Sequence, residues 1–231
     1  NDKIKYYRTT LSDGCSFYRL FIFSLFEYYI LSNNADQIKK LTIDIYKIIK
    51  EKISEEEEKQ GILDNFYKIL YVIINSVESK NIDFAYQALI AGFNNNESLF
   101  DNICETYIRS IVYLIAEDFS KEVTTKYQIK VRKSINKEIE KDEIDDINLN
   151  LIVNVQNEAF KYAYQLLPMI FNIDLNIFIL DGSVSEDKSN IKSSTELFSS
   201  LPSDESQEKG LDILPPFTIN LIYNLSYFIF H

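Results

Sequence analysis

The chain has 231 residues, of which 46% are hydrophobic, so it is long enough to bury a substantial core in a single domain. Its 24 basic and 35 acidic residues give a net charge of −11, which argues against nucleic acid as a partner because phosphate binding needs clustered Lys and Arg. Two cysteines and one histidine are too few for a disulfide framework or a zinc site. We therefore expect no metal, no cofactor and an intracellular, cytoplasmic location.

The first predicted elements are a short extended lead-in over residues 4–10 and a helix over residues 16–31. The second range is an apolar run, but Ser24 and Glu27 interrupt it and Arg19 lies near its start. It therefore falls short of the roughly 20 clean apolar residues that a bilayer span needs. The run predicts a helix buried on nearly all sides and no membrane span.

Helical spacing of apolar residues continues through the first half of the chain. A turn at residues 33–36 and a break at Gly61 separate the first of these helices from their neighbours. Residues 130–146, in which charges of both signs alternate, predict a solvated linker rather than a cation site, because EF-hand spacing is absent. The predicted helices cover residues 38–52, 62–77, 81–93 and 97–122.

Strand patterns appear only in the last third of the chain. A helix over residues 155–171 precedes a strand at 173–180, in which apolar residues alternate. Residues 183–214 are rich in Ser, Asp, Glu and Lys, and predict a long mobile loop or a partly ordered insertion. Residues 217–223 and 227–230 then predict two antiparallel strands that form a hairpin.

The turn that opens the first helix carries the most specific motif. Residues 13–19 read Asp-Gly-Cys-Ser-Phe-Tyr-Arg. This resembles the active-site turn of the ovarian-tumour (OTU) class of cysteine proteases, and most closely of its otubain branch, which reads Asp-Gly-Asn-Cys-Phe-Tyr-Arg with Cys as the nucleophile. The resemblance puts Ser16 at the nucleophile position, and Asp13, Gly14 and Cys15 in the turn that forms the oxyanion region. A serine gains little from a helix N-terminus and needs a general base, whereas a cysteine there can ionise beforehand.

The base and its orienting partner should come from the final hairpin. In otubains that hairpin reads roughly Leu-Leu-Tyr-Arg-Pro-Gly-His-Tyr-Asp-Ile, and residues 221–230 here read Leu-Ile-Tyr-Asn-Leu-Ser-Tyr-Phe-Ile-Phe. Without a gap, Tyr227 stands at the His and Ile229 at the Asp; with a one-residue deletion the His is missing and Phe228 takes the Asp position. His231, the one histidine, would lie more than about 10 Å further along an extended strand. Neither alignment leaves a triad.

The resemblance implies a fold as well as a site. We expect an α+β, papain-like OTU/otubain fold, mostly helical, with a small antiparallel sheet packed on the central helix at residues 16–31. It would form one domain over residues 1–231. An engineered Cys-to-Ser change would explain Ser16 alone and not the loss of the other two positions, so the three losses together favour a natural pseudoenzyme.

Three functions follow as hypotheses. The first is a catalytically inactive pseudo-deubiquitinase that binds ubiquitin, a ubiquitin-like protein or another protein partner. The second is a structural subunit of a larger assembly, suggested by 16 Tyr and 16 Phe that could make protein contacts. The third is an active ubiquitin thioesterase whose nucleophile was mutated to Ser16 or has moved to Cys15. Loss of nucleophile or base costs on the order of 10⁶ in turnover in a triad hydrolase, so the first two are preferred over an enzyme.

Overall fold

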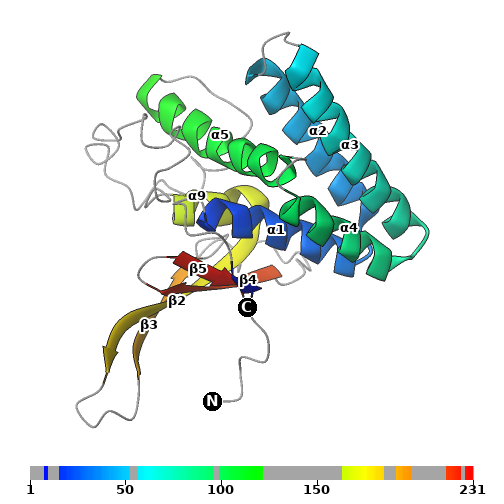
Figure 1. Ribbon diagram of the computed structural model, residues 1–231. Coiled ribbons are helices and arrows are strands. Elements are labelled where there is room, and N and C mark those ends of the chain that lie inside the picture. Colours follow the sequence, from blue (N-terminus) through cyan, green and yellow to red (C-terminus); the bar gives the residue numbers. More distant parts are fainter. Residues whose placement is uncertain are drawn as a thin grey trace, which may run out of the picture. The chain divides into compact units, whose positions relative to one another are not determined.

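The chain combines helices with one sheet, as expected (Figure 1). This computed structural model describes residues 8–9, 16–52, 57–95, 99–121, 163–184, 191–198, 217–224 and 227–230. In chain order, the elements are β1 (Arg8–Thr9), α1 (Ser16–Leu31), α2 (Ala35–Lys52), α3 (Glu57–Glu78), α4 (Ile82–Asn94), α5 (Phe100–Lys121), α9 (Ala163–Phe171), β2 (Ile173–Val184), β3 (Ile191–Phe198), β4 (Phe217–Asn224) and β5 (Tyr227–Phe230).

Residue contacts divide the chain into two compact units. One contains residues 1–20 and 111–231, and we call it the sheet unit; the other contains residues 21–110, and we call it the helical unit. Helices α1 and α5 each contribute to both. The expectation of a single domain over residues 1–231 stays a prediction.

Five strands form the sheet in the order β1-β5-β4-β2-β3. Three of the pairings are antiparallel, but β2 and β4 are parallel, so the expectation of a purely antiparallel sheet was wrong at this pairing. Topology explains the difference. Because β3 runs antiparallel to β2, it ends beside the start of β2, and a strand that begins there and pairs with the other side of β2 runs parallel to it.

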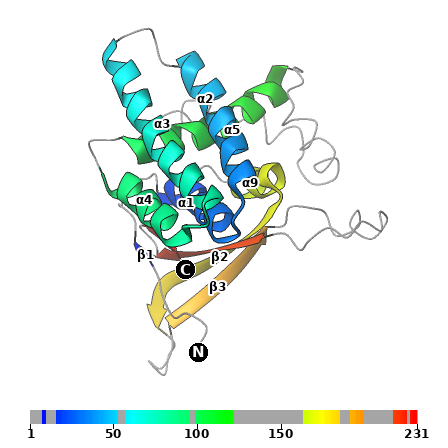
Figure 2. The same cartoon turned by 90° about the vertical axis from the view of Figure 1, so that its right-hand side faces the viewer.

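Strand β3 shows that the segment predicted over residues 183–214 is not a mobile loop throughout. Figure 2 shows β2 and β3 as a long curved pair, and their register runs from Leu175↔Phe198 to Val184↔Ile191. The residues of β3 are mostly polar, which hid the strand, but an edge strand can be polar because it gains its stability from one ladder of backbone hydrogen bonds. Residues 185–190 and 199–214 of the predicted loop lie outside the described residues.

The core of the sheet unit lies between the strands and α9, which contacts β2 and β3. Alternate residues of β2 are buried, as are Ile219 and Leu221 of β4, which is the period expected for one face of a sheet. The buried residues of α9 are Ala163, Leu166, Leu167 and Ile170, with Pro168 also inside the helix. Of the helix predicted at residues 155–171, the first eight residues lie outside the described part of the chain.

Aromatic rings fill the core of the helical unit. Phe100 of α5 lies 4.9 Å from Phe66, 5.4 Å from Phe93 and 6.3 Å from Phe26, measured between ring centroids. Phe23 in turn lies 5.1 Å from Phe93 in an edge-to-face arrangement. Contacts of this kind add about 0.5–1.5 kcal/mol per pair beyond the area they bury. Part of the aromatic richness of the sequence therefore serves packing.

Helix α1 is buried along most of its length. Every residue from Ser16 to Phe26 is buried, which confirms the helix predicted from the apolar run. In the described residues, none of the helices combines the length and the apolar character needed to traverse a bilayer.

Replacement of two helical glycines, Gly61 and Gly92, by alanine should change the free energy of unfolding in opposite directions. Gly61 in α3 is exposed and a Cβ there would meet nothing within 4 Å, whereas at buried Gly92 in α4 a Cβ would lie 3.2 Å from Ile69 and from the Phe100 ring. We expect Gly61→Ala to raise the free energy of unfolding by about 0.5–1 kcal/mol, because alanine restricts the unfolded chain. Gly92→Ala should lower it by about 1 kcal/mol, because overpacking exceeds that gain. Urea denaturation of both variants tests this, and equal shifts would contradict the packing of α4 on Phe100.

Candidate functional site

Ser16, predicted from the motif to stand at the family nucleophile position, is the first residue of α1 and only 4% exposed. Phe17, Tyr18 and Arg19 follow it in the first turn, and all three are buried. Asp13, Gly14 and Cys15, predicted to form the oxyanion turn, lie outside the described residues. The helix therefore begins where the motif predicts.

An aromatic contact fixes the start of α1 in the sheet unit. The ring of Phe17 meets that of Tyr164 on α9 edge to face, at 4.6 Å between centroids and an interplanar angle of 80°. The same ring lies 5.5 Å from that of Tyr18. Because α9 packs on β2 and β3, this contact links Ser16 to the scaffold that carries the final hairpin.

Tyr227 and Ile229, predicted to stand at the positions of the base and its orienting partner, belong to β5, and β5 pairs with β4 as predicted. The register places Asn224 opposite Tyr227 and Ile222 opposite Ile229. The two positions are therefore part of a regular hairpin in the same unit as Ser16.

Strand β1, which precedes the motif in the chain, pairs with β5. Thr9 stands opposite Ile229 and Arg8 opposite Phe230, so the chain that leads into the turn is hydrogen-bonded to the strand of the base position. Ser16 follows Thr9 by seven residues, which can span at most about 25 Å. The sequence predicted the extended lead-in but not its partner, because two residues carry too little pattern to identify a pairing.

The groups predicted for these positions differ from those of a thiol protease triad. A phenol titrates near pH 10 and is therefore protonated and a poor base at neutral pH, and an isoleucine side chain can neither accept nor donate a hydrogen bond. A serine hydroxyl requires a base within hydrogen-bonding reach before it can attack a carbonyl. His231 lies outside the described residues. Within the described ranges, no three His, Cys, Asp or Glu side chains gather closely enough to hold a metal ion.

An amide pair in the sheet was missed from the sequence. The Asn176 side-chain amide on β2 donates to Oδ1 of Asn220 on β4 at 2.9 Å, and the two residues are register partners. Their neighbours Ile177 and Leu221 are buried, so the asparagines occupy the opposite face of the sheet. An asparagine in each of two alternating apolar segments was the available signal. The pair fixes the parallel register and has no evident chemical role.

Cys104 on α5 is an unreactive thiol. It is fully buried, and burial, with a smaller effect from the charge of Asp101, holds its pKa well above the usual value. Because the thiolate is the reactive form, we expect iodoacetamide at pH 8 to modify Cys104 at least about 10³-fold more slowly in the native protein than in denaturant. Mass spectrometry of tryptic peptides measures this. Rapid native labelling of Cys104 would contradict its burial.

The chain belongs to the otubain family, peptidase C65, whose model matches residues 1–228. Family membership confirms the resemblance drawn from residues 13–19 and the α+β otubain fold that it implied.

Solved structures with a similar fold include two complexes. A chain of "h/ceOTUB1-ubiquitin aldehyde-UBCH5B~Ub" is 16% identical with a TM-score of 0.52, and the match covers 97% of this chain and 74% of that chain. A chain of "a ceOTUB1 ubiquitin aldehyde UBC13~Ub complex" is 13% identical with a TM-score of 0.49, over 97% of this chain and 77% of that chain. At this identity the first likeness supports the fold alone. A search of curated proteins finds no significant match.

Proposed function

We propose that this chain is a catalytically inactive otubain that binds ubiquitin or a ubiquitin-like protein. The observation that carries the proposal is the set of residues at the three family positions: Ser16, Tyr227 and Ile229. They stand on the elements expected of an otubain, at the start of α1 and on β5. The fold is kept while the three groups that would perform the chemistry are replaced.

Three replacements together are hard to reconcile with turnover. Removing the nucleophile or the base alone costs on the order of 10⁶ in turnover in a triad hydrolase, and effects of residues that act as a unit do not simply add. Hydrolysis by this chain should therefore be indistinguishable from background.

Binding can survive the loss of catalysis. A standard protein–protein interface covers about 800 Å² and about 20–30 residues on each partner, so three side chains are a small part of it. The complex with a TM-score of 0.52 to this chain contains ubiquitin aldehyde and UBCH5B~Ub. Ubiquitin is therefore the first partner to test. The paucity of cysteines favours the cytoplasm as the place where the two would meet.

A calorimetric titration with monoubiquitin tests the proposal. We expect saturable binding with a Kd below about 1 mM. Ser16→Ala should bind with the same affinity, because the hydroxyl has no catalytic part to play. Absence of heat at about 1 mM ubiquitin would contradict binding. Slow hydrolysis that Ser16→Ala abolishes would instead contradict inactivity.

A structural subunit is the second candidate, and one observation favours it. Several large apolar side chains of the helical unit are exposed, among them Tyr71 at 67% and Phe84 at 55%. Exposed aromatics are enriched where proteins meet other proteins. This role is compatible with ubiquitin binding, because the two could use different surfaces.

A further inference from the structure

An exposed apolar surface lies on the helical hairpin of α2 and α3. We call it the hairpin face, and it consists of Ile43 and Tyr46 on α2 and of Tyr67, Tyr71 and Val72 on α3. Ile43 is 53% exposed, Tyr46 41% and Tyr71 67%. All five belong to the helical unit. Large apolar side chains that are exposed together, rather than scattered singly, mark an interaction site.

Two contacts across the hairpin show that these side chains are adjacent. Lys39 on α2 pairs with Glu78 on α3, and the ring of Tyr46 on α2 lies 5.6 Å from that of Tyr67 on α3. Along α2, Ile43 lies between Lys39 and Tyr46. Along α3, Tyr71 lies between Tyr67 and Glu78. Positions 39, 43, 46 and 50 are three or four residues apart, so their side chains lie on one face of α2. The stretch is about 17 Å long, or three helical turns.

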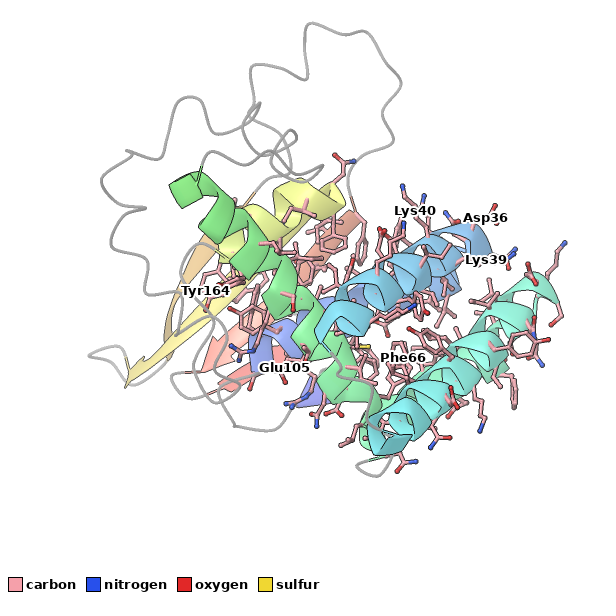
Figure 3. The ribbon with its side chains drawn as sticks, turned by 90° about the horizontal axis from the view of Figure 1, so that it is seen from above. Asp36, Lys39, Lys40, Phe66, Glu105 and Tyr164 are labelled. Atoms are coloured by element: carbon pink, nitrogen blue, oxygen red, sulfur yellow. The ribbon has the colours of Figure 1, made fainter. Side chains whose placement is uncertain are left out.

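The charges of α2 beside the hairpin face are mostly basic, with four lysines against Asp36 and Asp44 between positions 36 and 50, whereas α3 adds Asp64, Lys68 and Glu78. Lys40, Lys47 and Lys50 are exposed on α2, and the ammonium of Lys50 lies 5.3 Å from the centroid of the Tyr46 ring. Lys39 is half exposed and already paired with Glu78 and Asp36. Figure 3 shows Lys39 and Lys40 with Asp36 along the start of α2. A basic rim on a chain of net charge −11 favours an acidic partner over a basic one.

The Tyr67 hydroxyl needs a hydrogen-bond acceptor. It is shielded from solvent, and no described residue accepts a hydrogen bond from it. Burial, with a smaller contribution from Tyr46, raises the pKa of Tyr67 to about 12, so the phenol remains a donor at neutral pH. A buried donor without an acceptor costs about 1–3 kcal/mol. A carboxylate brought by a partner would supply the acceptor, with a small movement of Tyr46.

We propose that the hairpin face binds an amphipathic helix of a partner protein, with an apolar stripe that packs on Ile43, Tyr46 and Tyr71 and acidic residues that meet the lysine rim. Such recognition uses apolar anchors at positions i, i+3, i+4 and i+7 of the bound helix. The length of the face fits a helix of about three to four turns. The inference goes beyond the proposed function, because it assigns a second surface and a second kind of partner.

A designed peptide tests the inference on the full chain. The probe is a fluorescent peptide of about 18 residues with Leu at i, i+3, i+4 and i+7 and Glu at most other positions; a second peptide has the same composition in an order that forms no apolar stripe. Fluorescence anisotropy should show saturable binding of the first peptide alone. The affinity should fall severalfold when the salt concentration rises from about 50 to about 300 mM. Equal binding of both peptides, or none at about 1 mM, would overturn the proposal.

Three variants locate the binding. Tyr71→Ser should weaken it about tenfold or more, as expected for an anchor at the centre of an interface. Lys47→Glu should weaken it about fivefold, whereas Lys80→Glu, an equal charge change at an exposed position after α3, should leave it within about twofold. Equal effects of the two lysine variants would overturn the assignment.

Monoubiquitin is the competitor that separates this inference from the proposed function. If ubiquitin displaces the peptide, the hairpin face is the ubiquitin site and the second-partner proposal is wrong. Peptide binding that ubiquitin does not displace supports it, whether or not ubiquitin itself binds elsewhere.

Discussion

The triple variant Ser16→Cys, Tyr227→His and Ile229→Asp is expected to hydrolyse a ubiquitin C-terminal amide at least about 10³-fold faster than the native chain, whereas Ser16→Cys alone stays inactive. A thiol at the start of α1 ionises more readily beside the helix N-terminus. Turnover also requires a histidine, whose protonated form donates to the leaving group, and a carboxylate that orients this histidine. The β1–β5 and β4–β5 pairings supply the frame on which the three groups would meet.

A fluorogenic amide of ubiquitin measures this rescue. The matched control, Ser16→Ala with the same two changes on β5, keeps the base and its partner but lacks a nucleophile, and should show no activity. Circular dichroism verifies that an aspartate at position 229 leaves the sheet intact. Activity in Ser16→Cys alone would mean that another group serves as the base. Activity of the native chain that Cys15→Ala removes would revive the thioesterase hypothesis, with the nucleophile moved by one residue.

The second large effect is expected at the ion pair inside α5. The Arg109 Nε donates to the Glu105 carboxylate at 2.7 Å, and the two side chains are only 4% and 2% exposed. Arg109→Met should lower the free energy of unfolding by about 3–5 kcal/mol, because it leaves a carboxylate buried without its countercharge. Whole domains are stable by only about 5–15 kcal/mol, so the loss would be conspicuous.

Urea denaturation of two further variants separates charge from packing. Glu105→Leu together with Arg109→Met should recover most of the loss, because neither charge then needs a partner. Lys39→Met removes a cation from an exposed pair, with Glu78, and should leave the unfolding midpoint nearly unchanged. If Arg109→Met and Lys39→Met had equal effects, the burial of the Arg109–Glu105 pair would not matter to stability.

The sequence predicted those elements whose residues carry a strong local pattern. The run from Ser16 to Phe26 has no polar stripe, so a helix buried on all sides was the one arrangement that satisfied it. The same local logic placed Ser16 at the start of α1, and Tyr227 and Ile229 on the last strand. A short motif and a period of two or 3.6 are enough for such assignments.

What the sequence did not reveal depends on residues far apart in the chain. Strand β3 has no apolar alternation and is held by backbone hydrogen bonds to β2. Such a pairing leaves no pattern of side chains from which the strand could be predicted. The parallel β2–β4 pairing and the β1–β5 pairing likewise follow from topology. The hairpin face was hidden for another reason. Ile43 and Tyr71 stand outside the apolar repeats of their helices, and only the packed hairpin shows that they are exposed.

The measurement that tests the central claim most directly is a titration of the native chain with diubiquitin, followed by electrophoresis of the same samples after prolonged incubation. Our account predicts saturable heat and intact diubiquitin, because the fold binds while Ser16, Tyr227 and Ile229 cannot perform hydrolysis. Monoubiquitin accumulating in proportion to the protein present would contradict inactivity. Absence of any heat would contradict binding and leave the structural role as the function to pursue.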